Sequence, residues 1–178
     1  MGKLVEITHV SLGGQIDPLD WAYPYLDDEH AAYAEAQLVA ADALFLGRRT
    51  YEGLSAAYEA MPSSPFVDRM NSIPKFVASR TLGTAGWNAT VIEGEVPRFV
   101  AGLKAERNLL KYGNGPLDVV LMGHGLIDEF HVLLTPAAVG KGRHMFEELN
   151  GASQLRLAEL RRFASGVVHL VYEPTDSS

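Results

Sequence analysis

The 178-residue sequence contains no cysteine. This absence excludes disulfide bonds, thiolate catalysis and cysteine-ligated zinc sites, and it fits a protein of the reducing cytoplasm. The six histidines lack the spacing of metal ligands, so we expect no metal site. No serine lies in a G-x-S-x-G motif, and the pattern of a serine hydrolase of that type is therefore missing.

Positive charge and long apolar runs are also scarce. Fifteen lysines and arginines stand against 22 acidic residues, giving a net charge of −7. Nucleic-acid binding depends on clustered basic side chains, so we expect no nucleic-acid partner. The first apolar stretch is too short and too interrupted for a signal peptide or a membrane span. We therefore expect a cytoplasmic protein with no membrane partner.

The length and composition are those of an ordinary globular domain. Hydrophobic residues make up 47% of the chain, and neither repeats nor a long linker divide it. We predict a single domain over residues 1–174, followed by a frayed tail at residues 175–178. Short β-rich runs alternate with helical patterns, which indicates an α/β fold with a largely parallel sheet.

The expected elements follow from apolar periodicity and turn residues. The predicted strands are 3–10, 43–46, 74–79, 90–94, 108–113 and 127–134, followed by an antiparallel hairpin of 155–163 with 166–172. One helix is predicted after an N-cap at Asp27 or Asp28, and another from an N-cap at Thr50 to Met61. Two shorter helices are predicted at 97–106 and 117–122.

The stretch LFLGRRTYEG combines a buried strand with two adjacent arginines. Gly47, Arg48, Arg49 and Thr50 lie where this strand ends and the next helix begins. Open α/β sheets bind ligands at this edge, and helix N-termini attract phosphate. Arginine adds a planar set of donors that matches phosphate geometry. The arrangement favours an anionic ligand, although an arginine pair alone is more often solvated surface.

Two further strand ends carry similar signals. Ser79 and Arg80 follow the next predicted strand, and the glycine-rich segment at 111–117 follows a third. Together the three sites indicate a phosphorylated dinucleotide, and an arginine pair that can meet a 2′-phosphate favours NADP over NAD. The alternative for Asn114–Gly115 is a simple tight turn.

The chain resembles the dihydrofolate-reductase-like family. The motifs that carry the resemblance are VSLGG, GRRTYEG, PKFVASRTL, KYGNGPL, GLIDEFHVLLTPAAVGKGRHMF and SGVVHLVYEP. They are most similar to the reductase domain of the bifunctional riboflavin-biosynthesis deaminase-reductase and its stand-alone bacterial relatives. The resemblance implies a three-layer α/β/α fold with a central, mostly parallel sheet and a C-terminal antiparallel hairpin. It also implies NADPH as hydride donor and a homodimer.

The resemblance assigns roles to residues by position. The implied cofactor residues are Gly47, Arg48, Arg49 and Thr50 at the 2′-phosphate and pyrophosphate, Ser79 and Arg80 at the adenosine, Gly113, Asn114, Gly115, Pro116 and Leu117 under the pyrophosphate, and Ser11 and Leu12 near the nicotinamide. The implied substrate is a small heterocycle, either pterin-like or a ribosylaminopyrimidine.

The sequence departs from the family pattern after the first strand. Relatives carry Ser-Leu-Asp-Gly, whereas this chain has glycine at position 13. Asp27 or Asp28 could match the carboxylate that assists protonation in dihydrofolate reductases; the alternative is simple helix capping. Trp21 and Tyr25 could line a pocket for a flat ring, or they could pack their loop onto the core.

These patterns leave three hypotheses. The leading one is an NADPH-dependent reductase of a small heterocyclic substrate. The second is a dimeric NADP-binding module without turnover, which the replacement at Gly13 favours. The third is a structural α/β protein whose basic strand ends are ordinary surface.

Overall fold

The structure, a computed structural model, describes residues 1–175. It forms two compact units. The first unit comprises residues 1–4 and 34–112, and the second comprises residues 5–33 and those from 113 onward. Of the expected frayed tail, Thr175 donates its N–H to the carbonyl of Gln154 at 3.1 Å, and residues 176–178 lie outside the described residues.

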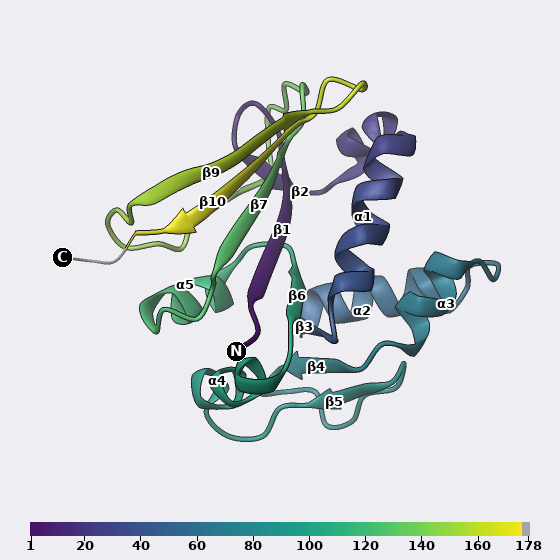
Figure 1. Ribbon diagram of the computed structural model, residues 1–178, viewed down its shortest axis with the longest axis vertical. Helices are drawn as coiled ribbons and strands as arrows, with labels where there is room; N and C mark the ends of the chain where they lie inside the picture. The colour runs from purple at the N-terminus through teal and green to yellow at the C-terminus, as the bar shows by residue number, and fades with distance from the viewer. Residues whose placement is uncertain (176–178) are drawn as a thin grey trace. The chain divides into compact units, whose positions relative to one another are not determined.

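The first unit contains four parallel strands. They are β3 (Ala43–Gly47), β4 (Lys75–Ala78), β5 (Ala89–Val91) and β6 (Leu109–Tyr112), in the order β5-β4-β3-β6. Leu44, Phe45 and Leu46 are fully buried, as expected for an apolar strand between two paired neighbours. The helices are α2 (Arg48–Tyr58), α3 (Pro65–Ser72) and α4 (Val96–Glu106) (Figure 1).

The second unit combines parallel and antiparallel pairing. Strand β1 (Leu4–Val10) is parallel to β7 (Glu129–Leu134), β10 (Val168–Pro174) is antiparallel to β7, and β9 (Leu155–Arg162) is antiparallel to β10. Figure 1 shows β9 and β10 side by side as a hairpin. Two short strands, β2 (Gln15–Asp17) and β8 (Arg143–His144), pair with each other. The remaining elements are a 3₁₀ helix, η1 (Asp20–Tyr25), and α5 (Pro116–Gly123). Helix α1 (Asp28–Ala40) starts in this unit and ends in the other.

The α/β class, the parallel strands and the C-terminal hairpin are confirmed. The N-cap predicted at Thr50 is wrong, because α2 begins two residues earlier and Gly47 precedes its first turn with extended backbone angles (φ −75°, ψ 161°). Helix α3 and the β2–β8 pair were not predicted. Within residues 1–175, no helix is long and apolar enough to cross a membrane.

Candidate functional site

The N-terminus of α2 has an unusual distribution of charge. Arg48 and Arg49 occupy its first turn, which contains no acidic residue, and among the described residues no side chain caps it. The first N–H groups of a helix are unpaired and give this end a partial positive charge. Two arginines at the positive end of a helix repel that charge, and a bound anion would remove the repulsion. This helix end therefore fits a phosphate group.

The loop after β4 lies beside this helix end. Gly47 pairs in register with Ala78, so the segment that starts at Ser79 follows β4 at the same sheet edge. Arg48 reaches this loop directly, donating from Nη1 to Oγ1 of Thr81 at 2.6 Å, and its Nε donates to Glu52 at 2.7 Å. The first unit thus brings together the predicted residues of two strand ends.

Ser79 gives this loop its shape. Its Oγ accepts the backbone N–H groups of Thr81, at 3.2 Å, and of Leu82, at 3.0 Å. These bonds turn the chain immediately after the strand and leave the neighbouring Arg80 exposed. Ser79 therefore has a structural role of its own, and Arg80 is a third cationic side chain at this edge, after Arg48 and Arg49.

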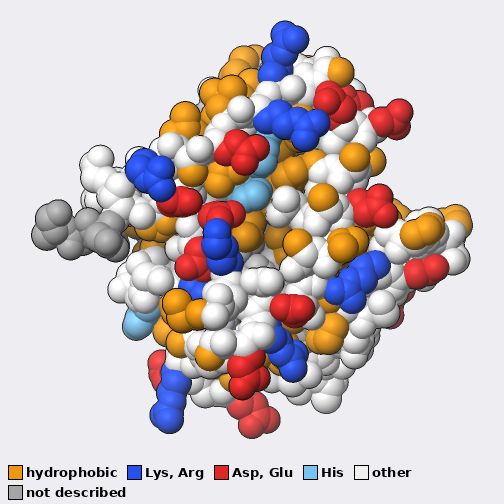
Figure 2. Space-filling view, in the orientation of Figure 1, with side chains coloured by type: hydrophobic (Ala, Val, Ile, Leu, Met, Phe, Trp, Pro, Cys, Tyr) orange, Lys and Arg blue, Asp and Glu red, His pale blue; other side chains and the backbone are white. Residues whose placement is uncertain are grey.

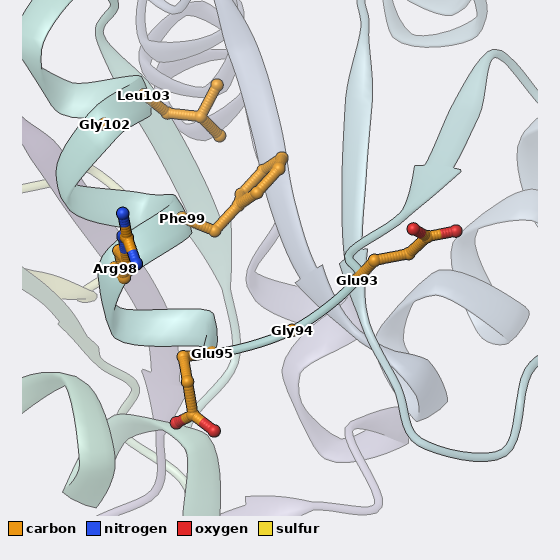
Figure 3. Close-up of a pocket in the computed structure, with 7 residues that line it drawn as sticks. All are labelled: Glu93, Gly94, Glu95, Arg98, Phe99, Gly102 and Leu103. Atoms are coloured by element: carbon orange, nitrogen blue, oxygen red, sulfur yellow. The ribbon is translucent and has the colours of Figure 1, made fainter.

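The first unit also contains a hollow that the sequence did not indicate. Its volume is about 540 Å³, and it lies where the chain passes from β5 into α4. Figure 3 shows its lining residues: Glu93, Gly94, Glu95, Arg98, Phe99, Gly102 and Leu103. Two carboxylates against one guanidinium make the hollow unfavourable for phosphate.

In the second unit, Asn114 of the predicted glycine-rich loop is an internal anchor. It is buried, its Nδ2 donates to the buried carboxylate of Glu6 at 3.1 Å, and its Oδ1 accepts the N–H of Phe146 at 2.9 Å. Its carbonyl accepts a bond from Nη2 of Arg143 at 2.8 Å. The side chain of Asn114 therefore holds the loop in place, and only the backbone around it remains for a ligand.

The same loop leads into a helix that is capped internally. Gly113 has a positive φ of 76°, which glycine adopts without strain. The N–H of Gly115 donates to the carboxylate of Asp118 at 2.8 Å, while Pro116 and Leu117 form the first turn of α5. A carboxylate thus already lies at this helix start, and the pyrophosphate role of residues 113–117 stays a prediction.

Ser11 organises the turn that replaces the family's Ser-Leu-Asp-Gly. Its buried Oγ accepts the N–H groups of Gly13 at 3.3 Å and Gln15 at 3.1 Å, and its hydroxyl donates to Oε1 of Gln15. A Cβ at Gly13 would lie 2.5 Å from that same Oε1. The Gln15 amide thus occupies the space of a side chain at position 13, and it also contacts Nε2 of His144 at 3.3 Å.

Leu12, Tyr25 and Trp21, which the sequence assigned to the nicotinamide and substrate, have different surroundings. Leu12 is 63% exposed, while its N–H donates to the carbonyl of Ala137 at 3.0 Å. Tyr25 donates from its hydroxyl to the carbonyl of Pro136 at 3.1 Å. Nε1 of Trp21 is buried with no hydrogen-bond partner among the described residues. Tyr25 therefore anchors its segment, and Trp21 has an unused donor.

Asp27 caps α1, as the alternative interpretation predicted. One carboxylate oxygen accepts the N–H of His30 at 2.9 Å, and the other accepts the N–H of Ser165 at 3.0 Å. These bonds, the one from His30 first, lower the pKa of Asp27. A carboxyl group held in its ionised form is a poor proton donor. The assignment of Asp27 to catalysis stays a prediction, and the geometry weakens it.

A cluster of histidines on the second unit was missed by the sequence analysis. His9 on β1 contacts His30 on α1, with 3.1 Å between their Nε2 atoms. Nδ1 of His131 on β7 lies 2.8 Å from the Tyr33 hydroxyl oxygen and 3.1 Å from Nε2 of His169 on β10. Each of three predicted strands contains one histidine, but only the folded sheet brings these histidines together. His131 and His169 are buried, and the histidine atoms that Figure 2 shows on one face lie among hydrophobic, acidic and basic side chains.

Burial controls the charge of this cluster. Desolvation is the largest effect in each case, and it lowers the pKa of His9 and of His169 to about 4. The pKa of His30 is also lowered by burial, while the carboxylate of Asp27 acts in the opposite direction. His9, His30 and His169 are therefore largely neutral at pH 7.

Comparisons with known proteins give a consistent result. The family model described as the RibD C-terminal domain matches residues 8–169. Protein YwjB of Bacillus subtilis (strain 168) is 29% identical over 171 residues, which are 93% of this chain and 94% of YwjB.

Two solved structures share the fold. A putative riboflavin biosynthesis protein from Shewanella sp. PV-4 has a TM-score of 0.75 at 22% identity, covering 97% of this chain and 99% of its own. Dihydrofolate reductase from Enterococcus faecalis, complexed with NADP(H), has a TM-score of 0.66 at 17% identity and covers 98% of both chains. The expected dihydrofolate-reductase-like fold is thereby confirmed.

Proposed function

The chain belongs to the RibD C-terminal domain family, and from this premise we propose that it is an NADPH-dependent reductase of a small heterocyclic substrate. The substrate would be pterin-like or a ribosylaminopyrimidine, and riboflavin biosynthesis is the proposed setting. The similar fold of a dihydrofolate reductase complexed with NADP(H) supports the cofactor. The lack of cysteine supports a cytoplasmic location.

One observation carries the proposal: the arginine-rich, uncapped N-terminus of α2. Arg48, Arg49 and Arg80 would hold the 2′-phosphate, and the N–H groups of the first helical turn would add further donors. When bound, NADPH supplies a hydride to a C=N or C=O carbon. The protein's contribution is to bind the cofactor, orient the substrate and exclude water.

The test is a calorimetric titration with NADPH and, separately, with NADH. The double substitution Arg48→Ala and Arg49→Ala is expected to weaken NADPH much more than NADH, because only NADPH carries the 2′-phosphate. A charge-assisted contact contributes about 1.5–3 kcal/mol, so the loss for NADPH should be roughly tenfold to a hundredfold.

The matched control is Arg162→Ala on the exposed edge strand β9, which removes an arginine far from α2 in the sequence and should leave both affinities unchanged. Equal losses for the two cofactors in the double variant would refute the 2′-phosphate role. Absence of binding by either cofactor to the wild-type protein would refute the proposed function itself.

The second candidate is a dimeric NADP-binding module without turnover. It is favoured by the Gln15 amide, which fills the space where relatives place an aspartate after Ser-Leu. NADPH binding with no NADPH oxidation on dihydropterins or ribosylaminopyrimidines would support the module. Oxidation with any of these substrates would establish the reductase.

A further inference from the structure

In one pair of the histidine cluster, His9 and His30, the two imidazole rings have different surroundings. The Nε2 atoms of His9 and His30 are 3.1 Å apart, and their ring centroids are separated by 5.0 Å. A hydrogen bond between two imidazole nitrogens needs one hydrogen, so the neutral pair shares a single N–H between these atoms. Nδ1 of His9 is buried without a partner among the described residues, whereas His30 is only half-buried.

We propose that His30, supported by His9, is the proton donor of the reduction, an inference that rests on the proposed function. As the hydride from NADPH reaches the carbon of a C=N bond, the N–H bond at Nδ1 of His30 breaks. The proton passes to the substrate nitrogen, and the imidazolium becomes a neutral imidazole. Water then returns a proton to His30, so the pair is unchanged after each turnover.

The position of the pair along β1 supports this role. His9 is the second-last residue of β1, and Ser11 directly follows Val10, the last residue of the strand. Ser11 begins the turn that the family resemblance places near the nicotinamide. His9 is therefore two residues from the turn at which nicotinamide binding is expected.

The charges next to His30 make it a better proton donor than Asp27 or His9. Both oxygens of Asp27 accept backbone N–H groups, which holds it ionised. Its negative charge stabilises a proton on His30, while burial excludes one from His9. An added proton therefore resides on His30, and its Nε2–H can donate to the Nε2 lone pair of His9.

The other groups around His30 leave Asp27 as the dominant charge. Tyr33, one turn along α1, has its ring centroid 6.5 Å from that of His30. Glu29 is paired with Arg161 of β9 at 3.2 Å, so these two charges offset each other. His169 of β10 is largely neutral above pH 5, because its pKa is lowered to about 4. Changing Asp27 should therefore change the proton affinity of His30 selectively.

The first experiment follows the histidine Cε1–H signals of the full-length protein by NMR between pH 4 and pH 8. His30 is expected to titrate below 6.5, and Asp27→Asn, which keeps an oxygen for the helix cap, should shift its midpoint to lower pH. If His30 does not titrate below 6.5 and does not respond to Asp27→Asn, the proposal is refuted without any substrate.

The second experiment measures NADPH oxidation in a single turnover with dihydrofolate or a ribosylaminopyrimidine. The wild-type rate should rise as the pH falls from 8 to 5.5, and the Asp27→Asn profile should move with the NMR midpoint. His30→Gln should lower the rate at pH 6 by about 10²-fold or more and flatten the profile. His124→Gln should match the wild type. A merely structural role would leave the profile in place.

NADPH titration separates the possible failures. His30→Gln should bind NADPH like the wild type, which also shows that the variant is folded. If the wild type oxidises NADPH and His30→Gln keeps its rate and pH profile, the proton-donor role is wrong and the reductase stands. If the wild type oxidises NADPH with neither substrate class, the proposed function fails and this inference fails with it.

Discussion

His169 is 4% exposed on β10, and its ring nitrogen lies 3.1 Å from that of His131. At this depth a charged imidazole loses its hydration, and the neighbouring His131 and Arg161 add repulsion. Burial likewise disfavours the charged form of His9, and the neighbouring His30 adds repulsion. Each ring therefore remains neutral in the folded protein at pH values where it would be protonated in the unfolded chain.

This difference predicts how stability depends on pH. The folded-state pKa values of His9 and His169 are about 4, against 6.5 in an unfolded chain, so the unfolded state binds more protons between these values. The free energy of unfolding should be at its plateau above pH 6.5 and should fall as the pH decreases toward 4. Each group contributes a slope of up to about 1.4 kcal/mol per pH unit.

Urea unfolding at pH 7.5, 6.0 and 5.0 measures this slope. His169→Gln removes one titrating group and should make the slope shallower. His124→Gln, at an exposed position after α5, should not change it. Identical slopes in the wild type and His169→Gln would contradict the assignment of His169 as a buried neutral ring.

At the scale of elements, local patterns were sufficient where one segment carries its own signal. The apolar run before Gly47 predicted β3, and the turn at 164–166 predicted the β9–β10 hairpin. Helix α3 was missed although Ser64 and Pro65 form a recognisable start, an N-cap followed by proline in the first turn. The β2–β8 pair joins segments more than 100 residues apart, and no local pattern could indicate it.

The same limit applies to the candidate site: residues marked by one local segment could be predicted, and contacts between distant segments could not. The two basic strand ends could be found because each directly follows its strand in the sequence. The His9–His30 contact could not, because it depends on how α1 packs against β1. The internal roles of Asn114 and Asp118 were also hidden, since their partners are set by the folded loop. Tertiary packing, and not residue type, decides these functions.

The cap of α3 gives a prediction at this scale. Oγ of Ser64 accepts the N–H of Val67 at 3.2 Å. Ser64→Ala removes this bond and should lower the free energy of unfolding by about 1 kcal/mol. Ser55→Ala in α2 is the control and should have little effect, because the Ser55 hydroxyl donates to the carbonyl of Glu52 within the same helix and caps no helix end. Equal values for the two variants in urea unfolding would show that the cap does not stabilise α3.

At the scale of the whole molecule, the second unit has an apolar sheet face with few charges. Alternation along β10 puts His169 on one face and Leu170 on the other, and the register pairs Leu170 with Val132 and Leu160. Leu160 is 61% exposed, and Leu157, paired with Tyr172, is 46% exposed. A contiguous exposed apolar surface of this kind is typical of an interface.

We propose that a second copy of the chain covers this face, as the family resemblance implies. The face is mainly apolar, with Arg162 beside Leu160, so its apolar part can pack against itself about a twofold axis. Light scattering should give about 39 kDa, twice the 19.4 kDa of one chain. Leu160→Glu should convert the dimer to a monomer, because it would bury two unpaired carboxylates.

Val39→Glu is the matched control, since Val39 is 67% exposed on α1 and the substitution adds the same charge. It should leave the mass at the dimer value, and both variants should keep the wild-type circular dichroism. A monomeric wild type would refute the dimer. A dimer that survives Leu160→Glu but dissociates in Val39→Glu would move the interface from the β9–β10 sheet face to α1.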